Sequence, residues 1–373
     1  MDVATARALF PVTRRIAYLN TAAVGLASTR LTEAYARVLE TWTANGFDYV
    51  RGEEAATAAR NAVARLIGAS AADVALVPSV SAAAGLVAAQ FLPAARGENL
   101  VVGEQEYSSN HFPWRQLVVR GYDIRLAAFR DGGVVPEEIA RHVDGGTRLI
   151  AVSAVQSATG HRTDLAAISG IAREHGALLF VDATQAVGAL DVTEDTPRVD
   201  FMAFSDHKFL LNAGRGMGYL YIRRERQADL VPFGAGWRAG AEPLGSFYGP
   251  RMVLSETASR FDASISWLAA IGDAICLDLI SEVGAAAIHA RNRDLSDRLR
   301  LCLADHGLTP QDPGQAARSS IVTVPLAPER LEDTTARLRT HGVTAAVRGG
   351  SVRFAVHFYN DEDDIDRAAR ALE

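Results

Sequence analysis

Residues 178–218 read LLFVDATQAVGALDVTEDTPRVDFMAFSDHKFLLNAGRGMG, and the predicted architecture follows from this segment. It covers two apolar runs, which begin at Ala177 and Val199 and have the length of buried parallel strands. The first run ends on Asp182, and the second is followed by Ser205-Asp206-His207-Lys208 and a glycine-rich turn. In open α/β sheets, ligands bind beyond the carboxyl ends of the strands. The stretch therefore predicts a site to which one strand brings an acid and its neighbour brings a lysine.

The acid and the lysine indicate which cofactor this site takes. Pyridoxal phosphate needs a carboxylate that keeps its ring nitrogen protonated and a lysine that holds it as a Schiff base. Asp182 and Lys208 supply these two groups. From the residues alone, two other interpretations stay open. An aspartate after a strand is also a good helix N-cap, and most lysines are solvated on the protein surface.

The same residues carry a family resemblance. VDATQAVG, DFMAFSDHKF and the glycine-rich turn resemble the class V aminotransferase group of fold-type I pyridoxal phosphate enzymes. That group includes cysteine desulfurases, kynureninases, isopenicillin-N-epimerase-like proteins and ergothioneine-type C–S lyases. Supporting matches extend from Tyr18 to Tyr359. The resemblance implies an α/β fold with a large domain around a mostly parallel seven-stranded sheet, a small α+β C-terminal domain, and a homodimer whose sites borrow residues across the interface.

The pattern along the chain agrees with this fold. From Val74 onward, strand-like apolar runs alternate with helical ones, which favours a doubly wound, mostly parallel sheet. We expect strands at residues 74–77, 99–102, 123–127, 148–152, 177–181, 199–204 and 217–222. We expect helices at residues 29–44, 53–67, 81–91, 110–119 and 165–175.

The alternation of strand-like and helical runs ends after residue 226. Residues 233–249 indicate an ordered, aromatic and glycine-rich loop. A long helical stretch is expected at 266–303, and it contains two glycines, Gly272 and Gly284, as candidate points of division. A small α+β domain is predicted from strands at 320–324 and 352–356 and helices at 329–340 and 361–372. The expected organisation is an N-terminal arm at 1–25, a cofactor-binding large domain at 26–250 and a small domain at 251–373.

Composition narrows the class of protein. The 373 residues are 49% hydrophobic and 22% charged, which is ordinary for a globular enzyme. The net charge of −6 comes from interspersed signs, so a nucleic acid is not expected as a partner. No apolar stretch has the length that crosses a bilayer, and the N-terminus lacks the apolar core of a signal peptide. Cys276 and Cys302 have no metal-ligand spacing and are expected to stay reduced, so we expect a cytoplasmic protein without a metal site.

Several further residues match the family's cofactor contacts. The resemblance assigns Gln185 to the phenolic oxygen of the cofactor, and Ser205 and His207 to its phosphate. A surface glutamine is the alternative for Gln185. Ser81 and Ala82 begin an alanine-rich helix after the first strand of the sheet, where converging backbone N–H groups bind an anion. Plain helix capping by Ser81 is compatible with that role.

Three more residues match positions that contact the cofactor in the family. Tyr107 lies in EYSSNHFPW, which resembles the segment whose aromatic ring stacks on the cofactor, although a core tyrosine also fits this pattern. Ser157 stands where the family often has an asparagine, and we expect it to bond the ring oxygen. The family segment Arg-Phe-Glu-x-Gly-Thr, whose threonine reaches the phosphate in a neighbouring subunit, is RFDASI at residues 260–265. The threonine is missing here, and Ser264 is expected to donate in its place.

Substrate-binding candidates come from three separate segments. Arg348, in AVRGGSVR, matches the arginine that holds the substrate α-carboxylate in the family, and its fork fits a carboxylate with two hydrogen bonds. The alternative is a surface arginine in a loop. Asn20, in YLNTAA, and Trp237, in the aromatic loop, are expected to shape the substrate pocket, together with Phe47-Asp48-Tyr49. The residues near the C-terminus that we expect to be structural are His357, Tyr359 and Asn360.

The positions at which this sequence differs from the family's motifs reduce the number of reactions that we expect it to catalyse. Cysteine desulfurases carry a mobile-loop cysteine before the C-terminal strand, and residues 345–356 contain none, which argues against persulfide formation. YLNTAA, ANGFDYV and RFDASISW are more similar to the C–S lyases and epimerase-like enzymes of secondary metabolism. We expect Lys208 to remove the Cα proton of a cysteine S-conjugate, so that a thiolate leaves and pyruvate and ammonia follow. A decarboxylating oxidative deaminase, an aminotransferase or amino-acid epimerase, and a non-catalytic binding protein stay as alternatives.

Overall fold

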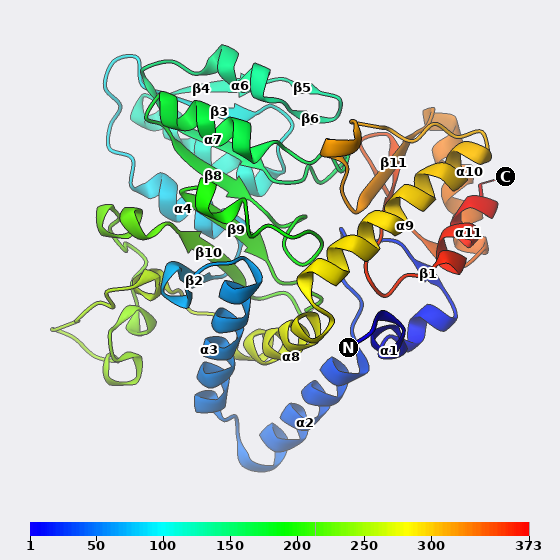
Figure 1. The fold of residues 1–373 in the computed structure, drawn as a ribbon. Helices are drawn as coiled ribbons and strands as arrows, with labels where there is room; N and C mark the ends of the chain where they lie inside the picture. The colour runs from blue at the N-terminus through cyan, green and yellow to red at the C-terminus, as the bar shows by residue number, and fades with distance from the viewer. Residues whose placement is uncertain (213, 373) are drawn as a thin grey trace.

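A seven-stranded sheet forms the centre of the larger part of the molecule (Figure 1). The computed structural model describes residues 1–212 and 214–372. In spatial order the strands are β2 (Val74–Val77), β10 (Gly218–Ile222), β9 (Phe201–Ser205), β8 (Leu178–Asp182), β7 (Thr147–Ser153), β3 (Asn99–Gly103) and β4 (Asp123–Ala127). Strand β10 is antiparallel to both of its neighbours, and the other pairs are parallel. The predicted mostly parallel sheet is confirmed, with each strand close to its expected bounds.

The two faces of the sheet carry separate apolar cores, because successive side chains of a strand point to opposite faces. On β8, Leu179 and Val181 point into one core and Phe180 points into the other. The first face is covered by helices α3 (Tyr49–Leu66), α7 (Leu165–Glu174) and α8 (Trp267–Val283), and the second by α4 (Val80–Ala89). Strands covered on both faces are apolar throughout, which is why they were recognisable as continuous apolar runs.

Capping side chains and a proline fix where the helices begin. Ser28 accepts a hydrogen bond from the N–H of Leu31 at the start of α2 (Thr29–Asn45), and Asp48 caps α3 in the same way. Because of this cap, α3 begins at Tyr49, earlier than predicted. The single helix predicted at 110–119 is wrong: Pro113 lies in the first turn of a separate four-residue helix, which is where a helix tolerates a residue without an N–H. The chain there forms the short turns η3 (Ser108–Asn110), α5 (Phe112–Arg115) and η4 (Gln116–Arg120).

Gly284 divides the long helical stretch, and Gly272 does not. Gly284 has a φ of +93°, a left-handed value that glycine adopts readily and that a helix interior excludes. Helix α8 ends there, and α9 (Ala285–Asp305) leaves in a new direction (Figure 1). Gly272 lies inside α8, where an added Cβ would overlap the hydroxyl of Tyr35. It therefore allows α2 and α8 to approach closely.

A three-stranded antiparallel sheet forms the core of the smaller part. Its strands, in spatial order, are β11 (Ile321–Pro325), β14 (Ser351–Ala355) and β13 (Ala346–Arg348), and α9, α10 (Pro328–Thr340) and α11 (Glu362–Arg370) pack with them. The sequence predicted β11 and β14 but missed β13, which has three residues. Strand β1 (Ala17–Tyr18) pairs in parallel with β12 (Val343–Thr344). The N-terminal arm, which begins with α1 (Val3–Ala8), thus joins the C-terminal part.

Helices α8 and α9 connect the two parts. Leu277 of α8 lies in the core beneath the large sheet, whereas Leu295 and Leu299 of α9 lie in the core of the small sheet. The predicted domain limits at residues 25 and 250 stay predictions. Other elements that the sequence did not predict include the hairpin β5 (Phe129–Arg130) to β6 (Gly133–Val134) and the helix α6 (Pro136–His142).

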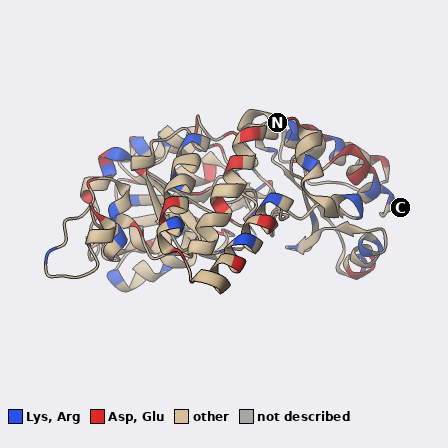
Figure 2. Cartoon of the chain, turned by 90° about the horizontal axis from the view of Figure 1, so that it is seen from below, with Lys and Arg blue, Asp and Glu red and all other residues tan. Residues whose placement is uncertain are grey.

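Charged side chains of both signs are interspersed over the molecule (Figure 2). Some form ion pairs between elements, as in Arg298 of α9 with Asp366 of α11, whose atoms lie 2.7 Å apart. An exposed pair of this kind contributes about 0–1 kcal/mol, so these pairs add little to stability. Among the described residues, no helix combines the length and the apolar character needed to span a membrane.

The N-terminal arm contacts the backbone around Lys208. Gly25 donates its N–H to the carbonyl of His207 at 2.9 Å. A Cβ at Gly25 would overlap the carbonyl oxygen of Lys208 and lie 2.9 Å from the Cα of Leu211. Because backbone atoms occupy this space, the close approach requires glycine.

We expect Gly25→Ala to lower the free energy of unfolding by about 1–3 kcal/mol, because the added methyl group displaces the arm or the Lys208 segment. Denaturant-induced unfolding measures this change. The matched control is Gly170→Ala in α7, where an added Cβ meets nothing within 4 Å. Alanine is the better helix former by about 1 kcal/mol, so this control should be neutral or stabilising. Equal stability of the two variants would contradict the assigned contact.

Candidate active site

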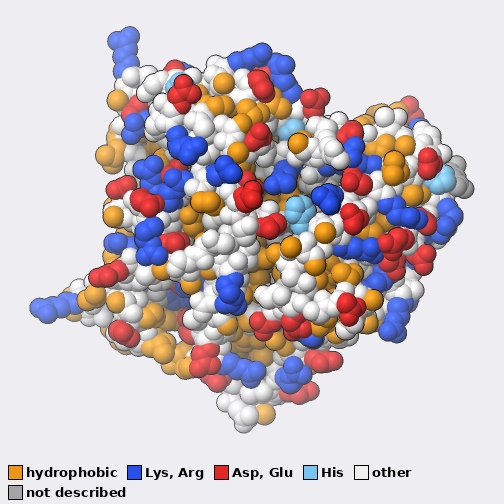
Figure 3. Space-filling model, in the orientation of Figure 1, with side chains coloured by type: hydrophobic (Ala, Val, Ile, Leu, Met, Phe, Trp, Pro, Cys, Tyr) orange, Lys and Arg blue, Asp and Glu red, His pale blue; other side chains and the backbone are white. Residues whose placement is uncertain are grey.

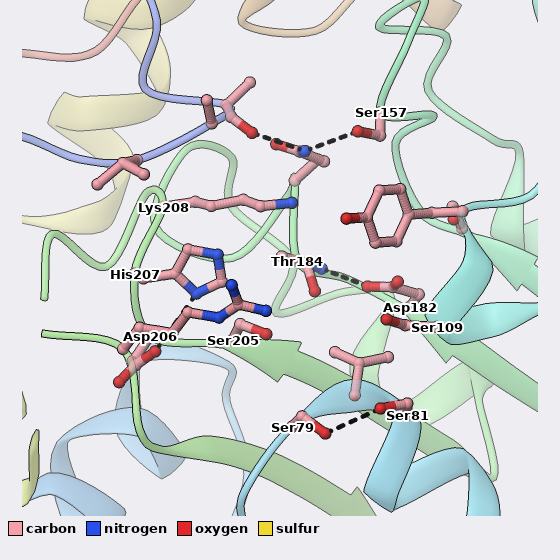
Figure 4. A pocket seen from close by; sticks show the side chains of 18 of the residues that line it. Ser79, Ser81, Ser109, Ser157, Asp182, Thr184, Ser205, Asp206, His207 and Lys208 are labelled. Carbon is pink, nitrogen blue, oxygen red and sulfur yellow. Dashed lines mark hydrogen bonds and ion pairs between the residues drawn. The ribbon is translucent and has the colours of Figure 1, made fainter. Parts of the chain in front are cut away.

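The predicted site forms at the carboxyl edge of the large sheet. Strands β7, β8 and β9 end there side by side, and β2, which runs in the same direction as β9, also ends there. A cavity of about 460 Å³ opens at this edge, a volume typical of small-molecule sites. Residues of the N-terminal arm and of the small sheet complete its wall. Figure 4 shows Ser79 and Ser81 at one end of the cavity, Ser157 at the other, and Lys208 between them.

Lys208 extends into the cavity beside the ring of Tyr107. Its Nζ atom lies 5.4 Å from the centroid of that ring. Burial lowers the pKa of Lys208 to about 8; the charge of Asp182 opposes this shift, and three arginines on the cavity wall add to it. A lowered pKa makes the amine neutral over a wider range of pH, and only the neutral amine is a nucleophile or a base. Lys208 is the only lysine in the sequence.

Asp182 lies beside a second buried carboxylate, which the sequence analysis did not single out. Burial raises the pKa of Asp182, although its Oδ1 accepts the N–H of Thr184 at 2.9 Å. Burial also raises the pKa of Glu106, which follows β3, to about 7. The N–H of Ser153 opposes this second shift by donating to Glu106 at 2.7 Å, and the charge of Asp182 adds to it. Ser153 pairs with Asp182 in the sheet register, so two acids flank one strand end.

A buried hydrogen-bond network holds the turn after β9. Asn212 donates from Nδ2 to Asp273 of α8 at 2.8 Å and accepts from the hydroxyl of Tyr35 of α2 at 2.9 Å. Tyr219 of β10 donates to the other oxygen of Asp273 at 2.6 Å. Burial raises the pKa of Asp273 well above its usual range, and the charge of Asp206 adds to this shift. The turn that carries the lysine is therefore fixed to two helices and a strand.

The backbone of this turn is strained. Leu211 and Arg215 have φ values of +70° and +40°, which are uncommon outside glycine. Asp206 accepts the N–H groups of Met217 at 3.1 Å and of Gly216 at 3.3 Å and thereby closes the turn. Strain of this kind persists where surrounding contacts impose it, and it concentrates at functional sites. The turn brings Arg215 to the cavity wall.

Residues near the C-terminus support the site from outside the cavity. The Nε2 atom of His357 lies 3.1 Å from the carbonyl oxygen of Phe209, the residue after Lys208. Burial lowers the pKa of His357 to about 3, so the ring is neutral and Nε2–H donates to this carbonyl. Asn360 donates to the carbonyl of Tyr18 at 3.0 Å and so holds the N-terminal arm. These contacts give both residues the structural role expected from the sequence.

One end of the cavity has the features of an anion site. The hydroxyl groups of Ser79 and Ser81 lie 3.0 Å apart at the start of α4, and Ser79 caps the helix by accepting the N–H of Ala82 at 3.2 Å. A helix start offers free N–H groups and the positive end of the helix dipole. Ser205 and His207 line the same cavity, as the sequence predicted. This end suits a phosphate.

The other end combines a glutamine, a serine and a buried arginine. Gln185 donates from Nε2 to the Oγ of Ser157 and to the carbonyl of Ala22, both at 3.1 Å. Arg353, on β14, donates from Nη1 to the carbonyl of Ser157 at 2.6 Å. Arg353 is 1% exposed, and burial lowers its pKa to about 10, so it remains charged at neutral pH. It brings a positive charge from the small sheet into the cavity.

Several buried polar atoms of the cavity have no hydrogen-bond partner among the described residues. They are Oγ1 of Thr184, Oε1 of Gln185, and Nε and Nη2 of Arg353; Nδ1 of His207 also lacks a hydrogen bond and lies 3.5 Å from a carboxylate oxygen of Asp206. A buried polar group without a partner costs about 1–3 kcal/mol, which favours the binding of a ligand that supplies one. Pyridoxal phosphate has an anionic group at one end and polar ring atoms at the other. The residues present therefore fit this cofactor.

The predicted site residues Asn20, Ala82, Trp237 and Ser264 do not line the cavity of the single chain, and neither do Phe47, Asp48 and Tyr49. Asn20 forms a backbone bridge with Ala355 instead, and Ala82 only donates its N–H to the helix cap. Trp237 packs on Phe247, with ring centroids 5.2 Å apart. Ser264 is exposed, and its proposed phosphate belongs to a neighbouring subunit. The roles given to these residues stay predictions.

Several residues of the cavity wall were not predicted from the sequence, among them Thr184, Arg215 and Arg353. A usable signal existed for Arg353. It lies between Val352 and Phe354 in a strand, and a buried charge needs a partner or a ligand. Thr184 offered a weaker signal, since it lies between two residues that were assigned to the cofactor. Arg215 gave none, because a charged residue in a glycine-rich turn is usually solvated.

Comparison with known proteins agrees with this site. The family model described as aminotransferase class-V matches residues 17–368. The chain belongs to the class-V aminotransferase family. The isopenicillin N epimerase of Streptomyces clavuligerus is 31% identical over 84% of this chain and 83% of that protein. A probable cysteine desulfurase of Methanothermobacter thermautotrophicus is 29% identical over 84% of this chain and 82% of that protein.

Solved structures share the fold. The apo cysteine desulfurase of Thermococcus onnurineus NA1 matches with a TM-score of 0.82 and 24% identity, over 97% of this chain and 95% of the other. The cystine C–S lyase C-DES, solved with its product cysteine persulfide, matches with a TM-score of 0.86 and 21% identity, over 98% and 99%. Class-V membership and the fit of the cavity identify pyridoxal phosphate as the cofactor and the chain as a pyridoxal-phosphate-dependent enzyme, similar in sequence to cysteine desulfurases.

The lowered pKa of Lys208 predicts how cofactor capture depends on pH. For protein freed of cofactor, the rate of capture should rise with pH and level off above about 8, because the neutral amine is then fully formed. The measurement is the growth of yellow absorbance, followed by borohydride reduction and peptide mass spectrometry. Since the chain has no other lysine, Lys208→Ala should abolish the reduced side-chain adduct. A rate that keeps rising toward the usual lysine pKa of 10.5 would contradict the assigned environment.

Proposed function

We propose that this enzyme is a carbon–sulfur lyase that cleaves a cysteine S-conjugate by β-elimination. The proposal rests on which side chains line the cavity. Lys208 has a lowered pKa, Asp182 lies at the end of the neighbouring strand, and Arg353 has unpaired donors. None of the described residues that line the cavity is a cysteine. A desulfurase that forms a persulfide on the protein needs a cysteine thiol of its own at the substrate sulfur. Cys276 is buried within α8, and Cys302 of α9 lies 3.8 Å from Asp366. Elimination needs no protein thiol.

Arg353 takes the role of holding the substrate α-carboxylate, which the sequence assigned to Arg348. The Nε and Nη2 atoms of Arg353 are buried without partners. A guanidinium in this state forms two charge-assisted hydrogen bonds with a carboxylate. Arg348 also lines the cavity, but it is exposed and donates from Nη1 to the carbonyl of Val347. Because Arg353 is buried and has unpaired N–H donors, it is better placed than Arg348 to bind the α-carboxylate, which all amino-acid substrates carry.

Each cavity residue then has a defined task. When bound, pyridoxal phosphate withdraws electrons from the substrate Cα and weakens its bonds. Asp182 keeps the ring nitrogen protonated, and the ring of Tyr107 covers the cofactor. Lys208 accepts the proton from Cα through its neutral Nζ. A thiolate then leaves Cβ, and the complete reaction consumes water and yields a thiol, pyruvate and ammonia.

A panel of cysteine S-conjugates and simple amino acids tests the proposal. We expect thiol and pyruvate in equal amounts, without carbon dioxide or hydrogen peroxide, because elimination keeps the carboxylate and uses no oxygen. Lys208→Ala should lower kcat by roughly 10²–10⁴-fold, the usual contribution of a general base. Arg65→Ala, which removes an exposed charge on α3, serves as the control. Carbon dioxide with hydrogen peroxide would indicate an oxidative deaminase, and pyridoxamine phosphate an aminotransferase.

A second candidate is an amino-acid epimerase, which the similarity to the S. clavuligerus protein favours. Epimerisation removes the Cα proton and returns a proton on the opposite face, so it needs a second proton donor. Tyr107 carries a hydroxyl group near Lys208 and is the side chain that we assign to this task in that case. Loss of optical activity from an intact substrate, without release of thiol, would support the epimerase and exclude the lyase.

We propose that the enzyme is a homodimer, because large apolar side chains remain exposed on the single chain. At the turn between α2 and α3, Trp42 and Tyr49 are 47% and 44% exposed. In the segment 230–253, which projects from the large part in Figure 1, Tyr248 is 91% exposed and Val253 is 72% exposed. Exposed apolar groups concentrated in this way mark interaction surfaces. A second copy also provides the subunit that Ser264 is predicted to serve.

Light scattering should give twice the chain mass of 39.8 kDa at micromolar concentration. Val253→Arg should weaken the dimer, because it places a charge on the apolar segment. Val119→Arg is the matched control, since Val119 is 86% exposed in η4, outside that segment. A monomeric wild-type protein would contradict the proposal.

The cellular setting that we propose is the cytoplasm. Both cysteines are unpaired, as is usual in a reducing compartment. The released thiol places the reaction in thiol metabolism or secondary metabolism.

A further inference from the structure

The cavity contains more positive charge than one amino-acid carboxylate requires. Besides Lys208, the cationic side chains that line it are Arg215, Arg348 and Arg353. Their charges all act on the Nζ atom of Lys208. In the part of the chain that the structure describes, only two acids, Asp182 and Asp206, line the same cavity. The substrate side of the cavity is therefore electropositive.

Asp182, Asp206 and Arg353 already have binding partners, either within the chain or in the proposed complex. Asp182 serves the ring nitrogen of the cofactor. Asp206 accepts the N–H groups of Gly216 and Met217 and closes the turn after β9. Arg353 serves the α-carboxylate of the substrate. The cofactor phosphate has the start of α4, on a different side of the cavity from the small sheet.

Arg215 and Arg348 have no carboxylate partner within residues 1–212 and 214–372. Arg215 lies in the strained turn of the large sheet, and Arg348 precedes the turn between β13 and β14 of the small sheet. The one hydrogen bond of the Arg348 guanidinium goes to the carbonyl of Val347. Figure 3 shows basic side chains and histidines at the junction of the two parts. Two free guanidinium groups thus approach one cavity from two different sheets.

We propose that Arg215 and Arg348 bind a second carboxylate, which the substrate carries on its S-substituent. The substrate class is then a cysteine S-conjugate with an acidic S-substituent. This inference rests on the proposed lyase function and names its substrate. Arginine suits the task because its planar fork offers paired N–H groups to a carboxylate, and the second carboxylate compensates the excess positive charge of the cavity.

Two conjugates of nearly equal size test the inference. S-carboxymethyl-cysteine carries the second carboxylate, and S-carbamoylmethyl-cysteine carries a neutral amide in its place. In the first reaction, the Cβ–S bond and the Cα–H bond break, and water is consumed. One S-carboxymethyl-cysteine and one water give one thioglycolate, one pyruvate and one ammonia, without any oxidant. We expect the holoenzyme to prefer the acidic conjugate by about 10-fold to 100-fold in kcat/KM, the usual value of a charged hydrogen bond.

Variants assign the preference to the two arginines. Arg348→Ala and Arg215→Ala should each reduce the ratio of kcat/KM between the acidic and the neutral conjugate. Arg353→Lys should raise KM for both conjugates alike, because both carry the α-carboxylate. Arg65→Ala, which removes a charge outside the cavity, should keep the wild-type ratio. Calorimetric titration of each conjugate into Lys208→Ala protein loaded with pyridoxal phosphate, which lacks the proton acceptor, gives a binding ratio that does not depend on turnover.

The outcomes separate this inference from the lyase proposal. Thiol release from both conjugates at equal kcat/KM would overturn the second-carboxylate site and leave the lyase intact. Tighter binding of the acidic conjugate without thiol release would overturn the lyase and support the site. A preference that survives both Arg348→Ala and Arg215→Ala would overturn the assignment to these residues. Failure of both conjugates to bind would also overturn it.

Discussion

The structure depends on the placement of an ammonium and a carboxylate at one poorly hydrated sheet edge. Removal of water disfavours both charges: it lowers the pKa of Lys208 and raises that of Asp182. Their mutual attraction opposes both shifts. The balance keeps Asp182 available as a partner for a protonated ring nitrogen, while it leaves Lys208 close to deprotonation near neutral pH. Parallel strands in register supply this geometry, because β8 and β9 end at the same edge.

The large sheet was readable from the sequence for a physical reason. Most of its strands are covered on both faces and are therefore continuous apolar runs, and turns rich in glycine or polar residues separate them; the edge strand β4, which contains Asp123 and Arg125, is the partly exposed exception. The strand β13 was not readable, because a three-residue edge strand owes its conformation to its neighbour β14. The same holds for the cavity. Lys208 and Asp182 were predictable from their place after strands, whereas Arg353 required knowledge of which face of β14 meets Ser157.

Segments far apart in the chain meet around Lys208. The arm holds it through Gly25, and the C-terminal part holds the next residue through His357. The buried hydroxyl groups of Thr21 and Tyr359 join the arm to the C-terminal part. Because these contacts all converge on one turn, a movement of the small sheet relative to the large one would reach the reacting amine. The cavity wall is thus sensitive to how the two parts are joined.

The single lysine has a practical consequence. A protease that cleaves only after lysine has one cleavage site in this chain, and that peptide bond lies in the turn below the cavity. In the native fold, its carbonyl group lies against Gly25, so a protease reaches it only after the turn has opened locally. When opening and closing are fast, the rate of cutting follows the population of the open form. Two fragments on a gel therefore report how often the catalytic turn opens.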